Sequence, residues 1–521
     1  MLQRTVTEFG ERPAVVCGEV RWTYAELDRR VRRFAAALLG LGVEAGERVG
    51  LLLPNGADWI VANLATLTIG AVCVPINARL RAREIDHVLR TSPIAILVTT
   101  EAFLSNRYLD LLEELIAPEE RGEGEVASAT YPSLRRVVAI GGARGWTVEA
   151  EALVAAADPD APRVAALTTA AAPDDAANVF WTSGSTGLPK GVVTSHRVLG
   201  NVWNVTEVLG VTAADRCLVP CPLFYVAGYY WCLLGPIMRG ACAVVQRDLT
   251  PEETLELIEV ERATTLIGVA DAHRRLLGVA RGSERDTSSL RAGYVGGGKL
   301  TEAEVEEMRA LGLDPLCTVY GMTETGGITT MTDRDASVAE IAATIGRPLP
   351  GFELRLVDPE GGEDAPLGAP AELWVRSPFD LVGYEGAEPR DPEEWFATGD
   401  LVERDADGPL TFAGRSKDVV KVGGENVTPA EVEEVLREHE RIDQVAVVGV
   451  PDPARSEVTA AVLVLSEEVD DGEIVAFCRA RLAPFKVPRH LVRVERLPHT
   501  ATGKVARAEV KALAATAAES S

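Results

Sequence analysis

Residues 182–192 read TSGSTGLPKGV, a run in which glycines, hydroxyls and one lysine replace the apolar pattern on either side. Glycines let the backbone adopt dihedrals closed to other residues, so that N–H groups approach an anion closely. The hydroxyls add further donors, and the lysine adds a positive charge. The run therefore predicts a phosphate-binding loop, whose members are Thr182, Ser183, Gly184, Ser185, Thr186, Gly187 and Lys190.

The residues before this run place it at the end of a strand. Residues 178–181, NVFW, have the apolar character of a short buried strand. Ligands collect at such strand ends in α/β sheets, which favours phosphate binding over a flexible Ser/Gly linker. The Walker A pattern is missing, since Gly503 and Lys504 are followed by Val505, and no GxGxxG follows a strand. Hypotheses of an ordinary P-loop kinase or a dinucleotide enzyme therefore lose support.

Composition bounds the class of protein. A chain of 521 residues with 47% hydrophobic and 25% charged residues is globular and long enough for two or more domains. A formal charge of −26 argues against nucleic acid as a partner, because nucleic-acid phosphates need a basic face. Local lysines and arginines would have to hold any nucleotide. The oligomeric state, a homodimer included, stays open.

The sequence gives little indication of a targeting signal, a membrane span or a metal-binding motif. Residues 1–15 lack the apolar core of a signal peptide, and the apolar stretch 226–245 is interrupted by glycine, proline and arginine. We therefore expect no membrane span. Eight scattered cysteines without a CxxC pair predict buried free thiols in a reducing cytoplasm. Six scattered histidines suggest no zinc site, so any metal is expected to arrive with nucleotide as Mg²⁺.

Periodicity predicts an α/β fold for residues 1–416. Helical spacing over 22–41 ends at Gly42, and a helix at 58–69 lies between strands at 48–53 and 71–76. This alternation is typical of a mostly parallel sheet covered by helices. A second α/β pattern fills 213–320, and shorter β-rich pieces follow from 351. Other expected strands are 178–181, 216–219, 241–246, 264–269, 352–357 and 372–375, and 117–124 and 150–175 are expected surface connections.

Residues 417–521 form a separate predicted α+β domain of ordinary size. Thr428 to Glu431 is a capping box with proline at the first helical position. Val432, Val435 and Leu436 then share one face of the helix, and strands are expected at 445–450 and 460–465. We place the domain boundary between Ser416 and Lys417.

Four more islands share the unusual composition of the first run: YGMTETGG at 320–327, TGD at 398–400, GRSKD at 414–418 and TATGK at 500–504. In this order, the five islands resemble the adenylate-forming superfamily of acyl- and aryl-CoA synthetases, luciferases and peptide-synthetase adenylation domains. The resemblance covers nearly the whole chain. It implies a large N-terminal domain and a small C-terminal lid that rotates between two reaction steps.

The resemblance also implies an activity. A carboxylate attacks the α-phosphate of Mg·ATP to give an acyl-adenylate and pyrophosphate, and a thiol, usually of coenzyme A, then displaces AMP. The run at 182–187 with Lys190 would hold the β- and γ-phosphates. Lys504 is expected to bridge carboxylate and α-phosphate oxygens during adenylation, as a point charge on a flexible stem.

The other islands receive nucleotide and thioester roles from the same resemblance. Tyr320 faces adenine with Gly321 and Met322 beside it, Thr323 reaches the α-phosphate, and Glu324 binds Mg²⁺ through a hard oxygen. Asp400 accepts from the ribose hydroxyls, with Arg415 nearby. Gly297 and Gly298 are expected in the wall of the adenine and acyl pocket, although a simple loop is an equal alternative. Lys417 matches the hinge, and Lys421, Gly423, Gly424 and Asn426 match the thioester-forming segment; the two glycines are equally explained by a turn.

Residues 221–228, CPLFYVAG, depart from the pattern of many relatives, which have histidine in the position of Tyr225. Tyrosine offers a hydroxyl but no change of charge near neutral pH, so the balance of the two half-reactions is in question. Residues 221–235 contain aromatic side chains and lack an aspartate for an α-ammonium. A hydrophobic or ring-bearing monocarboxylic acid is therefore expected, activated by an ATP-dependent acyl-CoA ligase. The alternatives are a member specialised in one half-reaction and a non-catalytic nucleotide-binding protein.

Overall fold

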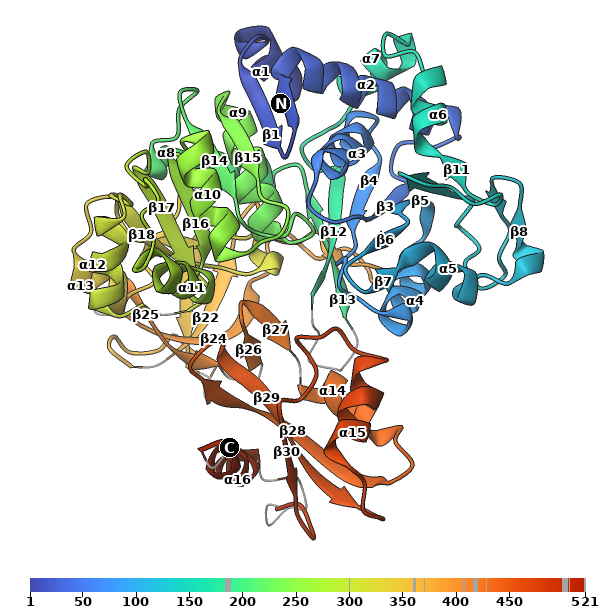
Figure 1. Ribbon diagram of the computed structural model, residues 1–521. Coiled ribbons are helices and arrows are strands. Elements are labelled where there is room, and N and C mark those ends of the chain that lie inside the picture. Colours follow the sequence, from blue (N-terminus) through green and yellow to red (C-terminus); the bar gives the residue numbers. More distant parts are fainter. Residues whose placement is uncertain are drawn as a thin grey trace. The chain divides into compact units, whose positions relative to one another are not determined.

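The computed structural model describes residues 1–182, 189–298, 300–358, 362–369, 371–404, 406, 408–415, 420–427, 429–498, 505 and 507–519 (Figure 1). The chain divides into two compact units. Unit 1 contains Met1–Ala78, Val88–Trp181 and Gly191–Ala413, and unit 2 contains Arg79–His87, Thr182–Lys190 and Gly414–Ser521. Each unit has its own buried apolar core.

The first large sheet of unit 1 has eight strands in the order β11-β10-β5-β3-β4-β12-β13-β23. Neighbours from β11 to β12 are parallel, and β13 and β23 are antiparallel. The strands are β3 (Arg48–Leu52), β4 (Val72–Pro75), β5 (Ile94–Thr100), β10 (Arg136–Ile140), β11 (Val148–Glu149), β12 (Ala176–Thr182), β13 (Lys190–Ser195) and β23 (Gly383–Tyr384).

Helices cover this sheet because their apolar faces require burial. In α3 (Ala57–Thr68), residues 57–66 are all buried, as expected for a helix that is apolar around its circumference. α2 (Tyr24–Gly40) packs against α3, and its first turn is held by a reciprocal capping box between Thr23 and Glu26. Other helices in this part are α1 (Leu2–Phe9), α4 (Ala82–Thr91), α5 (Tyr108–Leu115), α6 (Ala150–Ala156), α7 (Pro162–Thr168) and α8 (Val198–Leu209).

The second large sheet has nine strands in the order β2-β1-β15-β14-β16-β17-β18-β19-β20. Its centre, from β1 to β18, is parallel. Figure 1 shows this sheet with its helices beside the first. The strands are β1 (Pro13–Cys17), β2 (Val20–Thr23), β14 (Arg216–Val219), β15 (Cys242–Val245), β16 (Thr265–Val269), β17 (Ala292–Gly296), β18 (Leu316–Tyr320), β19 (Thr330–Met331) and β20 (Arg347–Pro348).

The helices that follow these strands include one wide helix. η2 (Ala227–Leu234) is a π-helix that lies directly after the CPLFYVAG segment, and its residues 228–234 are buried. Such π-turns are rare and are often found at functional sites. The remaining helices are α9 (Gly235–Arg239), α10 (Pro251–Glu261), α11 (Ala270–Ala280), α12 (Glu302–Ala310), η3 (Thr323–Thr325) and α13 (Val338–Ala343).

A four-stranded sheet completes unit 1. It consists of β21 (Glu353–Val357), β22 (Ala371–Arg376), β24 (Phe396–Arg404) and β25 (Leu410–Arg415), in that order. β22 is antiparallel to both β21 and β24 and alternates buried and half-buried residues. One face of this sheet therefore joins the core of unit 1.

Unit 2 is built on a mixed sheet. The long hairpin of β28 (Ile442–Asp452) and β29 (Ser456–Leu465) pairs with β26 (Val420–Val422) and β27 (Glu425–Val427) on one side, and β30 (His490–Arg493) runs parallel to β29. α14 (Pro429–Arg437) and α16 (Arg507–Glu519) pack on β28, and α15 (Asp471–Arg479) packs on α14. Val432, Val435 and Leu436 are buried, which confirms the predicted apolar face.

The mixed α/β class and nearly all expected strands and helices are confirmed, with ends shifted by at most four residues. The helix expected from residue 22 begins at Tyr24, because Thr23 caps it and Trp22 belongs to β2. The two expected surface connections are mostly exposed but contain regular structure. Residues 150–175 include the short helices α6 and α7, and residues 117–126 include a helical turn (Pro118–Glu120) and a small β-hairpin. Their exposed alanines and acidic residues hid a weak apolar face.

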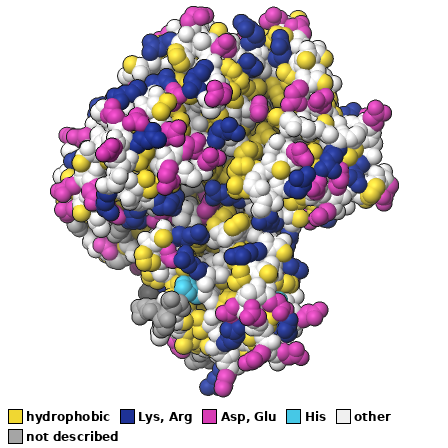
Figure 2. Space-filling view, viewed as in Figure 1, with side chains coloured by type: hydrophobic (Ala, Val, Ile, Leu, Met, Phe, Trp, Pro, Cys, Tyr) yellow, Lys and Arg dark blue, Asp and Glu magenta, His cyan; other side chains and the backbone are white. Residues whose placement is uncertain are grey.

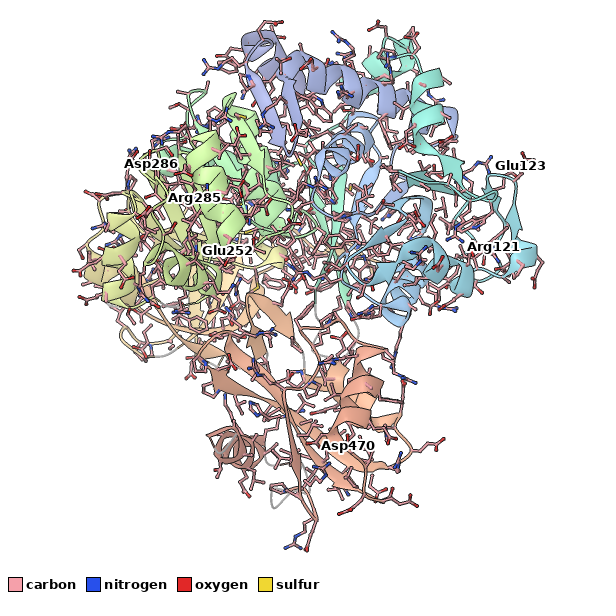
Figure 3. All side chains as sticks on the ribbon, in the orientation of Figure 1. Arg121, Glu123, Glu252, Arg285, Asp286 and Asp470 are labelled. Atoms are coloured by element: carbon pink, nitrogen blue, oxygen red, sulfur yellow. The ribbon has the colours of Figure 1, made fainter. Side chains whose placement is uncertain are left out.

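The surface is strongly but evenly charged. Acidic and basic side chains alternate over the face shown in Figure 2, which agrees with a solvated surface rather than a concentrated basic or acidic patch on that face. Many are paired locally; Arg285 binds Glu259 at 2.6 Å and Arg262 binds Asp286 at 2.5 Å, near the labelled Arg285 and Asp286 of Figure 3. Such exposed pairs contribute little to stability.

The cysteines are free and buried, as predicted. Burial raises the pKa of Cys217 and Cys317 to about 12, so these thiols stay protonated and unreactive near neutral pH. Of the helices that the structure describes, none combines the length and the apolar character that a membrane crossing requires.

Candidate nucleotide and acyl site

Four segments that carry predicted site residues follow the carboxyl ends of strands in the two large sheets. β12 ends at Thr182, β14 at Val219, β17 at Gly296 and β18 at Tyr320. The first leads into the 182–192 run, and the others lead into the 221–228 segment, Gly297 and Gly298, and the 320–327 loop. Carboxyl ends of parallel strands are where α/β folds collect their ligands.

Tyr320 and Asp400, which are 80 positions apart, meet in unit 1. The Tyr320 hydroxyl donates to Asp400 Oδ2 at 2.8 Å, and the ring of Phe412 lies 6.4 Å from that of Tyr320. Asp400 is only 2% exposed, and its backbone N–H donates to the Thr398 hydroxyl. The TGD island therefore has a defined geometry: the threonine orients the turn, and the carboxylate lies beside the aromatic ring.

Glu324 lies in η3, one turn after β18. Its backbone carbonyl accepts from the N–H of Leu381 at 2.8 Å. Its carboxylate accepts a hydrogen bond from the Tyr384 hydroxyl, and burial together with the charge of Glu324 raises the pKa of Tyr384 to about 12. A neutral donor thus orients Glu324 without neutralising it.

The strand that leaves the phosphate run pairs with the short strand that carries Tyr384, the partner of Glu324. Thr182 ends β12 and Lys190 begins β13, and β13 pairs with β23 so that Val192 lies opposite Tyr384. A Cβ at Gly191 would lie 2.8 Å from Val179 Cγ1, so only glycine permits this packing. The exit strand of the run and Glu324 are therefore linked through Tyr384. The predicted residues Ser183, Gly184, Ser185, Thr186 and Gly187 lie outside the described residues.

Glycines of the 320–327 loop allow it to pack closely on the rest of unit 1. A Cβ at Gly321 would lie 1.7 Å from the carbonyl oxygen of Gly327. A Cβ at Gly327, whose φ is +99°, would lie 2.4 Å from Cζ2 of Trp231 in η2. The loop that carries Thr323 and Glu324 thus rests directly on the π-helix that follows Tyr225. The described Met322 lies between these glycines and begins the turn that η3 completes.

The amide of Asn77 helps to hold Tyr225. Its hydroxyl accepts from Asn77 Nδ2 at 2.8 Å, and its ring lies 4.9 Å from that of Phe224. The preceding residues are fixed by Asn55, which accepts from the N–H of Leu223 and donates to the carbonyl of Cys221. The position of Tyr225 is therefore determined by the chain that follows β4 as well as by its own segment.

Gly297 and Gly298 follow β17 and lie against the start of α11. Gly297 has a φ of +69°, and a Cβ at Gly298 would lie 3.1 Å from that of Ala270. The positive φ of Gly297 and the close contact of Gly298 account for the two glycines in a pocket wall and in a simple loop alike.

In unit 2, Gly423 and Gly424 form the two-residue turn of the β26–β27 hairpin, with φ values of +58° and +88°. Two positive φ values in succession are typical of such a turn, so the turn interpretation of these glycines holds. The Lys421 N–H donates to Glu457 Oε2 at 3.0 Å. Lys417 and Lys504 lie outside the described residues, as do the side chains of Arg415 and Asn426.

Unit 2 also contains a buried charge cluster that the sequence did not suggest. Lys486 Nζ lies 2.7 Å from Glu84 Oε1 and 2.6 Å from Glu431 Oε1, and each of the three residues is at most 4% exposed. Burial raises the pKa of Glu431 to about 7 although Lys486 opposes the shift. Glu431 was expected to complete a capping box; its Oε1 accepts from Lys486, while Thr428 lies outside the described residues.

Comparison with known proteins agrees with this geometry. The model of the AMP-binding enzyme family matches residues 2–385, and that of the AMP-binding enzyme C-terminal domain matches residues 431–504. The chain belongs to the AMP-binding enzyme family. As an enzyme of this family and of the acyl-CoA synthetase type, it is an AMP-forming acid–thiol ligase.

Three relatives illustrate the range of this AMP-binding family. A 3-[(3aS,4S,7aS)-7a-methyl-1,5-dioxo-octahydro-1H-inden-4-yl]propanoyl:CoA ligase of Rhodococcus jostii is 34% identical over 97% of this chain and 96% of its own. A double mutant of o-succinylbenzoate CoA synthetase from Bacillus subtilis matches with a TM-score of 0.83 and 27% identity over 98% of both chains. The amide bond synthetase McbA of Marinactinospora thermotolerans also has a TM-score of 0.83, with 29% identity over 98% of this chain and 99% of its own.

Two polar partners in this AMP-binding enzyme escaped the sequence analysis. Tyr384 belongs to a two-residue strand, and Asn77 follows β4 without an unusual neighbourhood. Each binds a predicted site residue that lies in a distant segment of the chain. A Gly-Tyr pair shortly before the TGD island was the available signal for Tyr384; nothing local marked Asn77.

Proposed function

We propose that this enzyme activates a hydrophobic or ring-bearing monocarboxylic acid as an acyl-adenylate and transfers the acyl group to coenzyme A. The observation that carries the proposal is the junction of three islands in unit 1. Tyr320 binds Asp400, and Tyr384 connects Glu324 to the strand that leaves the phosphate run. Groups suited to adenine, ribose and metal therefore lie together in unit 1, and one of them is linked to the strand that leaves the phosphate run.

The proposed first step joins acid and nucleotide. A carboxylate oxygen attacks the α-phosphorus of ATP, the bond to the bridging oxygen of the β-phosphate breaks, and pyrophosphate leaves. Tyr320 stacks on adenine and the carboxylate of Asp400 accepts from ribose. Thr323 donates to the α-phosphate. The phosphate contacts are assigned to Thr182, Ser183, Gly184, Ser185, Thr186, Gly187 and Lys190.

Magnesium fits the chemistry of Glu324. A carboxylate is a hard oxygen ligand, and a neutral hydroxyl that donates to it does not cancel its charge. Bound Mg²⁺ would offset the charge of the nucleotide phosphates.

The proposed second step belongs to the C-terminal domain. The CoA thiolate attacks the acyl carbon, the bond to the phosphate oxygen breaks, and AMP leaves. We assign Lys504 to the first step and Lys417 to the hinge, with the domain boundary at Ser416 and Lys417. The Gly423-Gly424 turn leaves two positions without side chains for a pantetheine arm. The remaining assignments to this step are Lys421 and Asn426, with Arg415 beside the ribose.

The acid is inferred from η2 and from the relatives. Residues 229–231 are aromatic and buried, and residues 221–235 contain no acidic side chain to bind an α-ammonium. The names of the Rhodococcus and Bacillus relatives both contain a ring-bearing acyl group. Buried free cysteines support a reducing compartment such as the cytoplasm.

The test is a product analysis with a panel of carboxylic acids, ATP, MgCl₂ and CoA. We expect AMP, pyrophosphate and an acyl-CoA, and no thioester when CoA is omitted. Because one structural relative is named an amide bond synthetase, a parallel reaction replaces CoA with a primary amine. Formation of an amide without any thioester would show that the acyl acceptor is an amine and not a thiol. Release of ADP would refute the adenylation chemistry altogether.

A second candidate is an enzyme specialised in one half-reaction. The observation that favours it is the neutral Tyr225–Asn77 pair in place of an ionisable histidine. ATP–pyrophosphate exchange measures the first half, and thioester formation from supplied acyl-adenylate and CoA measures the second. Comparable rates in both assays would reject specialisation.

A further inference from the structure

Unit 1 contains a cavity of about 350 Å³ that is lined by α2, α3, α8, η2 and the start of β12. Its floor is formed by the buried Asn178, Tyr229 and Tyr230, and exposed residues such as Pro173 lie at its rim. Apart from Tyr229 and Tyr230, which also belong to the aromatic run from which the acid was inferred, none of the described site residues of the preceding sections lines it. The floor and rim together describe a pocket that extends from the surface into the core.

Two further aromatic side chains pack against the tyrosines of the floor. Tyr229 packs edge-on against Trp59 with ring centroids 5.3 Å apart, and Tyr230 packs edge-on against Phe180 at 5.3 Å. Trp59 and Phe180 are at most 2% exposed and do not line the cavity. The four rings are thus a wall behind the floor.

One polar group on the floor is left without a partner. Asn178 Nδ2 donates to the Tyr230 hydroxyl at 3.1 Å, and this hydroxyl lies 2.7 Å from the Thr194 hydroxyl. The Thr194 hydroxyl in turn donates to the backbone carbonyl of Asn178 at 3.4 Å. This closed chain fixes which way the amide points. Asn178 Oδ1 is buried and accepts no hydrogen bond from the described residues.

A buried acceptor without a donor is costly, so a ligand that brings a donor gains from the amide. The walls are mainly apolar, with Leu64 and Leu67 from α3, Leu199 from α8 and Leu234 from η2. The half-exposed Asp28–Arg32 ion pair lies among the lining residues as well. A cavity of roughly 150 Å³ suffices for benzene, so this one has room for a substituted ring.

We propose that this cavity binds a small, mostly apolar molecule with one hydrogen-bond donor, such as an alkylphenol or a medium-chain alcohol, as a site separate from the acid and nucleotide sites. The hydroxyl binds Asn178 Oδ1 and the apolar body contacts the leucines. Because Tyr229, Tyr230 and Leu234 belong to the helix that follows Tyr225, an occupied cavity holds η2 in its wide turn. The site therefore acts on the acyl pocket through η2.

The test uses 4-propylphenol and its isostere 4-propyltoluene, which lacks the donor. Calorimetric titration into the full chain without ATP is expected to give saturable binding of the phenol and at least tenfold weaker binding of the toluene. Asn178→Leu removes the acceptor at similar volume and should abolish this difference. Leu67→Trp, at a half-buried wall position, should weaken both compounds by filling the space.

Three results would overturn the proposal. They are unchanged phenol binding in both variants, equal binding of phenol and toluene to the wild-type chain, and displacement of the phenol by the acid substrate in proportion to the length of its chain. The last would assign the cavity to the acyl site instead. Because the titration needs neither ATP nor CoA, its failure leaves the adenylation assays unaffected.

Discussion

Two groups of buried or half-buried carboxylates differ in the charge of the side chains that bind them. In unit 1, Asp400 and Glu324 each receive a hydrogen bond from a neutral tyrosine hydroxyl. In unit 2, Glu84 and Glu431 share one lysine inside the core. A neutral donor does not cancel the charge of a carboxylate, whereas a buried cation pairs with it inside the core and commits it to the fold. The difference separates ligand-binding groups from structural ones without reference to sequence motifs.

The largest effect is expected from Lys486→Ala. The substitution leaves two buried carboxylates without a cation, and breaking a buried pair in this way costs about 3–5 kcal/mol. Urea unfolding at pH 7.5, with hydrogen exchange of the β28 and β29 amides, measures the loss. Lys511→Ala, which removes an exposed lysine 3.9 Å from Glu457, is the matched control and should change stability by less than about 0.5 kcal/mol. Equal effects of the two variants would contradict a structural role of the cluster.

Glu324→Gln should affect activity and leave stability nearly unchanged. Loss of one charge at a site for Mg·ATP is expected to lower kcat/KM about 100-fold, or about 2.7 kcal/mol, and to raise the Mg²⁺ concentration for half-maximal rate. Steady-state rates across a MgCl₂ series measure both. Glu353→Gln, at an exposed carboxylate paired with Arg376, is the control. An unchanged magnesium dependence would remove Glu324 from the metal site.

Tyr384→Phe tests whether the neutral donor positions Glu324. Without the hydroxyl, the carboxylate loses its orientation but keeps its charge, so we expect about a tenfold lower kcat with the magnesium requirement shifted in the direction of Glu324→Gln. Combining both substitutions should give little more than Glu324→Gln alone. Additive losses in the double variant would show that Tyr384 acts independently. Tyr131→Phe, outside the site loops, should have wild-type kinetics.

The pH dependence of unit 2 provides the smallest effect. The pKa of Glu431 is raised from 4.5 to about 7 in the folded state, so between these values the folded chain binds more protons than the unfolded chain. Stability therefore falls as pH rises through this window. Glu431→Gln should flatten this slope and stabilise the chain by about 1 kcal/mol at pH 8 relative to pH 5. A slope unchanged in the variant would assign the dependence to another group.

The same contrast explains how much of the fold and of the candidate site could be predicted from the sequence. Strand and helix periods predicted both α/β sheets because apolar alternation is a local property, and the islands stood out because glycine-rich turns exclude most residues. Tyr384 and Asn77 were missed because each becomes important only through a partner more than 50 positions away. Glu84 and Lys486 are 402 positions apart, and each looked like an ordinary surface charge. Long-range polar pairs leave no periodic signal.

Two short helices were missed for a related reason. α6 and α7 are each seven residues long and bury a single side chain in their own span, Ala150 and Val164. With one buried side chain per helix, no helical periodicity of apolar residues can be recognised in this segment rich in alanine and proline.

The contact between Gly327 and Trp231 has a consequence for natural variation. Since a Cβ at Gly327 would lie 2.4 Å from the indole, the two positions cannot change independently. A relative with a side chain in place of this glycine must carry a smaller residue in place of the tryptophan, and the space released then falls next to the acyl segment. Substrate range and the loop that carries Glu324 would thus change together during evolution, through paired substitutions at these two positions.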